Sequence, residues 1–130
     1  MKYELVINDT TYAFKFGFAF MRELNKTATV PVDGMPGKVE EVGMKYELAK
    51  LAERTPETLV EVLHIANKTE IPRIKKTELE EYLEGEECDM EQVFDEVIDF
   101  LSRANVCKKD MKAVLKIMKA QQEAQIPNAQ

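Results

Sequence analysis

The sequence has no tryptophan, one histidine and only two cysteines. Cys88 and Cys107 are too few for a disulfide framework, and their spacing does not match a metal site. Reduced thiols of this kind suit a cytoplasmic protein. We therefore expect a fold that is held together by its apolar core, with no metal and no other cofactor.

Basic residues are also scarce relative to acidic ones, since 18 lysines and arginines stand against 24 aspartates and glutamates. The net charge of -6 does not provide the basic surface that phosphate groups require, so nucleic acid is not expected as a direct partner. No apolar run approaches the roughly 18 residues of a membrane span. Met1 leads into a charged segment, not a signal peptide, so we expect neither membrane insertion nor export.

The chain length of 130 residues suits one domain. We assign this single domain to residues 1–122 and expect residues 123–130 to form a flexible C-terminal tail. The tail is small or polar in composition and contains Pro127, which does not favour a packed element.

Apolar and polar residues alternate from residue 3 to residue 16, which is the period of half-buried strands. Asp9 and Thr10 interrupt the pattern, and we take them as the centre of a hairpin turn. This register pairs Tyr12 with Ile7, Phe14 with Leu5 and Phe16 with Tyr3, and places all of these large residues on one face. The pattern then changes at Gly17, where a helix is expected to begin.

Most of the remaining sequence has helical periodicity, after a loop that we expect at residues 27–37. Thr55 followed by Pro56 marks one helix start, Thr77 with Glu80 a second, and Asp89 with Gln92 a third. The expected helices are residues 39–54, 56–67, 78–84, a strongly amphipathic helix from residue 90 that stops at Asn105, and 108–122. The sequence thus predicts an α+β, mainly α fold: an N-terminal β-hairpin followed by a bundle of five to six helices.

Candidate chemical groups have plain structural interpretations. His64 lies on a helix flank without a partner that would make it an acid or a base. The acidic residues 84–89 lack the order of a calcium-binding loop, and Gly17 belongs to no phosphate loop. We therefore do not expect an enzyme.

Apolar helix faces are the remaining candidates for function. In the helix 39–54, the inner stripe is expected to contain Val42, Tyr46 and Ala49, with Leu48, Leu51 and Ala52 as further candidates. In the last helix, Met111, Leu115 and Met118 form a stripe with few later residues to cover it. We predict that this stripe contacts a partner helix.

Three segments in order resemble one protein family: KFGFAFMRELNK at 15–26, IPRIKKTELEEYLE at 71–84 and FDEVIDFLSRANVCKKDMK at 94–112. They resemble the tail assembly chaperones of long-tailed bacteriophages and of prophages of Gram-positive bacteria. The resemblance extends from Met1 to about residue 116. None of the three segments is a catalytic signature.

The resemblance implies a role in phage tail assembly in the host cytoplasm. Similar proteins keep the tape measure protein soluble, help to recruit tail tube protein and are absent from the finished virion. In such phages a frameshifted longer form adds the contact with the tube. The alternative is an acidic helical adaptor or regulatory protein that forms a homodimer through its last two helices.

Overall fold

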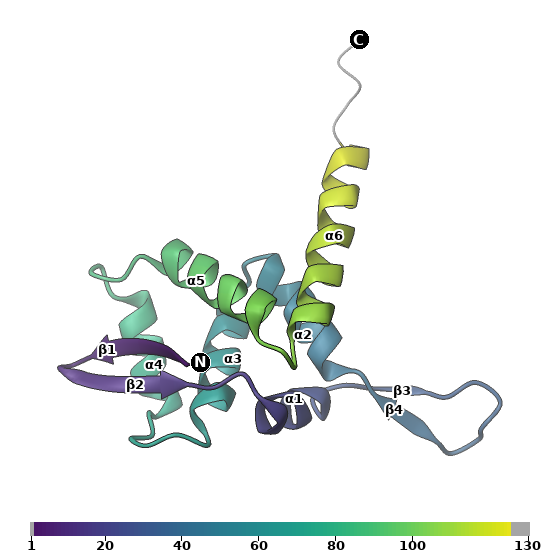
Figure 1. Ribbon diagram of the computed structural model, residues 1–130, viewed down its shortest axis with the longest axis horizontal. Coiled ribbons are helices and arrows are strands. Elements are labelled where there is room, and N and C mark those ends of the chain that lie inside the picture. The colour runs from purple at the N-terminus through teal and green to yellow at the C-terminus, as the bar shows by residue number, and fades with distance from the viewer. Residues whose placement is uncertain (1, 126–130) are drawn as a thin grey trace, which may run out of the picture.

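The computed structural model describes residues 2–125. Within this range two short β-hairpins are combined with six helices. The hairpins lie at opposite ends of the long axis, and the last helix rises out of the body (Figure 1). The elements in chain order are β1 Tyr3–Ile7, β2 Thr10–Phe14, α1 Phe18–Asn25, β3 Thr29–Pro31, β4 Val39–Glu41, α2 Gly43–Ala52, α3 Pro56–Asn67, α4 Lys76–Glu84, α5 Met90–Arg103 and α6 Lys108–Gln125. The predicted α+β, mainly α class is confirmed.

The N-terminal hairpin turns one residue earlier than the sequence pattern predicted. Asn8 and Asp9 both have positive φ angles, 51° and 64°, as the mirror-image turn of a two-residue hairpin requires. Ile7 therefore pairs with Thr10 and not with Tyr12. The predicted register was wrong by two residues, but a shift of two keeps every side chain on its face. The apolar face is consequently buried as expected.

This face packs onto helices to form the core. The Tyr3 ring lies 6.0 Å from that of Phe14 and 5.3 Å from that of Phe100 in α5, measured between centroids. Phe16 and Phe20 meet edge to face at 5.2 Å. Because two strands alone are marginal in water, these contacts with α1 and α5 stabilise the hairpin.

Buried Asn67 joins three separate segments at the end of α3. Its side-chain Nδ2 donates to the carbonyl oxygens of Ala13, at 2.9 Å, and Pro72, at 3.2 Å. Its Oδ1 accepts from the backbone N–H of Ile74 at 2.8 Å. These bonds attach β2 and the segment before α4 to α3, and they satisfy backbone groups that burial removes from water.

The segment that we expected to be a loop contains a second hairpin. Residues 29–31 pair with residues 39–41, so α2 begins at Gly43 and the predicted start at residue 39 was wrong. Asn25, at the end of α1, accepts a hydrogen bond from the N–H of Met44 at 3.1 Å. A side chain from another helix thus caps α2, whose own N-cap residue, Val42, has no side chain that can do so.

The other helix boundaries follow the capping signals closely. Helix α3 begins at Pro56, and Asp89 accepts from the N–H of Gln92 at 3.2 Å to cap α5, both as predicted. Helix α4 begins before the predicted cap Thr77, because the Glu78 carboxylate accepts from the N–H of Lys75 at 3.2 Å. Helix α6 continues to Gln125, so the first three residues of the predicted tail are helical, and residues 126–130 lie outside the described range.

Candidate functional site

An apolar groove of about 580 Å³ lies between α2 and α6. It is lined by residues from β3, the N-cap of α2, α2 itself and the first half of α6. These residues are Val30, Val42, Lys45, Tyr46, Ala49, Lys109, Asp110, Ala113, Val114 and Ile117. Most of the lining is hydrocarbon or aromatic, so the groove suits apolar side chains rather than a polar metabolite.

One wall of this groove contains Val42, Tyr46 and Ala49, which we expected to face inward. The large buried side chains of α2 are Met44, Leu48 and Leu51, and the last two were among the further candidates for the inner stripe. Tyr46 is 54% exposed, so its predicted place in the core was wrong. Tyr46 lies outside the core because the face of α2 that packs inward is the one that contains Met44, Leu48 and Leu51.

The predicted stripe on α6 is divided between the core and the surface. Met111 is fully buried and belongs to the core, so its expected exposure was wrong: α2 and α5 cover the first turns of α6. Leu115 and Met118, farther along, are half-buried. The large apolar residue that α6 exposes most is Ile117, at 58%, which the sequence analysis did not select. Its spacing of four from Ala113 was the available signal.

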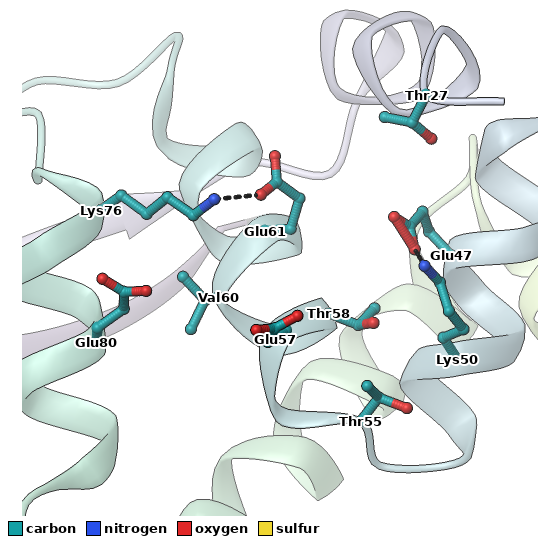
Figure 2. Close-up of a pocket in the computed structure, with 10 residues that line it drawn as sticks. All are labelled: Thr27, Glu47, Lys50, Thr55, Glu57, Thr58, Val60, Glu61, Lys76 and Glu80. Carbon is teal, nitrogen blue, oxygen red and sulfur yellow. Dashed lines mark hydrogen bonds and ion pairs between the residues drawn. The ribbon is translucent and has the colours of Figure 1, made fainter.

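A second pocket, of about 340 Å³, is polar and lies between α2, α3 and α4 (Figure 2). The Lys76 ammonium lies 2.8 Å from the Glu61 carboxylate, and Lys50 lies 2.8 Å from Glu47. The hydrogen bond to Glu61 raises the pKa of Lys76. Each lysine of this pocket is thus held by a carboxylate: the pair Lys76–Glu61 joins α4 to α3, and the pair Lys50–Glu47 lies within α2.

The histidine and the two cysteines lie outside both pockets, and burial shifts the pKa of each. Burial, followed by the charge of Lys68, lowers the pKa of His64. Burial raises the pKa of Cys107 to about 12, and its thiol points to the carbonyl of Phe16 at 3.8 Å. Cys88 is half-buried, and burial also raises its pKa. Across residues 2–125, no three His, Cys, Asp or Glu side chains are grouped closely enough to hold a metal ion.

The α2–α6 groove is therefore the candidate binding surface. The α2–α6 groove is open and apolar, and it lies where the chain presents Tyr46 and Ile117 to solvent. In the described part of the chain, no helix is both long enough and apolar enough to cross a membrane. An apolar surface of this kind fits contact with another protein.

Comparison with known families identifies the kind of protein. The family model described as phage tail assembly chaperone protein, TAC, matches residues 4–116. The chain belongs to this family. The match to the tail assembly chaperone model begins in β1 and ends one residue before Ile117, so it includes nearly all of the groove. No curated protein and no solved structure matches the chain.

Membership confirms the family resemblance that the three sequence segments suggested. It makes the protein an assembly factor whose partners are tail proteins in general. It also agrees with a site that offers an apolar contact surface.

Proposed function

We propose that this tail assembly chaperone binds the tape measure protein, keeps it soluble in the host cytoplasm and helps to recruit tail tube subunits. The observation that supports the proposal most directly is the apolar groove between α2 and α6, with Tyr46 and Ile117 exposed on its walls. Leu115 and Met118, half-buried on the same helix, do not line the groove, and we propose that they contact the client beside it. Met111 supports it from within the core.

The mechanism is shielding, with no bond made or broken. A long helical client exposes apolar stripes before the tail tube encloses it, and such stripes associate with one another. A chaperone that covers them with its own apolar groove removes this surface from water. Its net charge of -6 keeps the complex soluble. Once tube subunits cover the client, the chaperone is released and is absent from the virion.

Co-expression with the tape measure protein tests this proposal. We expect wild-type chaperone to raise the soluble fraction of the tape measure protein and to co-purify with it. Ile117→Glu places a charge in the groove and should reduce co-purification by about tenfold or more, because a buried unpaired carboxylate is costly. Ile71→Glu is the matched control, since Ile71 is 92% exposed and does not line the groove.

Two outcomes would contradict the proposal. One is a tape measure protein that remains insoluble with the wild-type chaperone. The other is wild-type co-purification by Ile117→Glu, which would remove the groove from the contact. Circular dichroism of both variants verifies that they are folded.

A second candidate function, an adaptor that acts as a homodimer, is suggested by the part of α6 that stands clear of the body with Leu115 and Met118 only half-covered (Figure 1). Light scattering of the purified chain distinguishes the two functions. A stable dimer that does not raise the solubility of the tape measure protein would favour the adaptor.

A further inference from the structure

The apolar groove between α2 and α6 has a positively charged border. Lys45 of α2 and Lys109 of α6 line it, and Asp110 is the one carboxylate in its lining. Neither lysine forms an ion pair with any residue in the range 2–125. Cations that have no partner of their own beside an apolar surface are available to pair with the carboxylates of a bound molecule.

The same sign of charge extends along all of α6. This helix contains five lysines against Asp110 and Glu123, which gives it a charge of +3. Because the whole chain carries -6, the remainder carries -9. Lysines of the body such as Lys50 and Lys76 are paired with glutamates, whereas none of the α6 lysines is paired with a described residue. The cationic helix is therefore a local feature of an acidic molecule.

The groove has the form of a seat for a helix. Val42, Tyr46 and Ala49 recur along α2 at positions i, i+4 and i+7, and Ala113 and Ile117 recur along α6 at i and i+4. Two neighbouring helices that each present such a row can receive a third helix between them. The short alanine side chains on both walls leave room for its backbone.

We propose that the occupant is an amphipathic helix of a partner protein whose apolar stripe is bordered by aspartate and glutamate. The inference rests on the proposed function. It specifies that the chaperone selects those helices of its client whose apolar stripe is bordered by acidic residues. Charge complementarity argues against a second copy seated symmetrically on this groove. Such a dimer would use the same surface twice and would bring the two lysine borders together.

Two synthetic peptides test the charge preference directly. Both carry the same apolar residues at i, i+3, i+4 and i+7, bordered by glutamate in one and by lysine in the other. Fluorescence anisotropy with the full chain should show the glutamate peptide binding about five to twenty times more tightly at low salt. The advantage should shrink at about 500 mM NaCl, because salt screens exposed charge pairs.

Charge-reversal variants test whether Lys45 and Lys109 cause the preference for the glutamate peptide. Lys45→Glu combined with Lys109→Glu should reverse the preference between the two peptides. Lys15→Glu combined with Lys75→Glu makes the same change in net charge at exposed positions outside the groove, and it should preserve most of the preference. Ile117→Glu should abolish binding of the glutamate peptide, which shows that the peptide occupies the groove.

The inference is overturned if the lysine peptide binds as tightly as the glutamate peptide, or if both double variants have equal effects. It is also overturned if the purified chain is a dimer that Ile117→Glu dissociates, since the groove would then hold a second copy. Tape measure co-purification that is unchanged in the Lys45→Glu/Lys109→Glu variant would remove the charge preference and leave the proposed function standing. If the tape measure protein still co-purifies when the glutamate peptide fills the groove, the groove is not its binding site. The proposed function of the groove then fails, while its preference for the glutamate peptide stands.

Discussion

At the scale of single residues, Gly43 and Asn67 determine how neighbouring elements meet. Gly43 lies where the end of α1 approaches the start of α2. A methyl group added there would overlap the carbonyl oxygen of Leu24 and the hydroxyl of Thr27, and would lie 2.9 Å from the carbonyl of Asn25. The absence of a side chain thus permits the contact through which Asn25 caps α2. The sequence alone does not reveal this role, because the cost of a close approach depends on residues in another helix.

Gly43→Ala should therefore destabilise the fold by about 1–3 kcal/mol, the usual cost of forcing extra atoms into a packed site. Urea denaturation measures the loss. Gly17→Ala serves as the control, since a methyl group there meets only the flexible Lys15 side chain, at 3.4 Å. Equal stability of the two variants would mean that the contact between α1 and α2 yields easily.

At the scale of elements, the success of prediction depended on how strongly each segment is patterned. Helix α5 has a clear apolar stripe and an aspartate cap, and both were predicted from sequence. Strands β3 and β4 are three residues each, and none of their side chains is fully buried, so they lack the alternation that identifies a strand. The groove was missed for a different reason: its walls come from two helices, and the contact between them is not visible in the sequence.

Phe94 measures how much α5 contributes to stability. Its side chain is 2% exposed, and the Arg54 guanidinium lies 5.8 Å from the centre of its ring. Phe94→Ala should cost about 3–5 kcal/mol through lost burial and a residual cavity. Phe18→Ala, at a position that is 61% exposed, should change thermal stability far less. A melting temperature of Phe94→Ala equal to that of the wild type would contradict the packing of α5.

At the scale of the whole molecule, α6 combines two roles along one axis. It is anchored by Cys107, which directly precedes the helix, and by Met111 in its first turns, both fully buried, and its later part stands free of the body (Figure 1). The sequence showed that the helix exists but placed the exposed stripe too early. Burial of Met111 depends on how α2 and α5 pack around it, which no periodicity within α6 reports.

Truncation separates these roles. A chain that ends after Met118 loses side chains that are exposed from residue 119 to residue 124, and its free energy of unfolding should fall by less than about 1 kcal/mol. A chain that ends after Asp110 loses buried Met111 and should lose about 2–5 kcal/mol. Chemical denaturation followed by circular dichroism compares the two. If the longer chain is as unstable as the shorter one, the outer turns of α6 contribute to the fold.

An anchored helix with a free outer end also works as a spacer. With 18 residues and a rise of about 1.5 Å for each, α6 spans about 27 Å. Polypeptide, a tag or a fluorophore joined beyond its tip would start at a distance from the core and would not need to be accommodated there. A group attached beyond the tip of α6 therefore leaves the packing of the chaperone body unchanged.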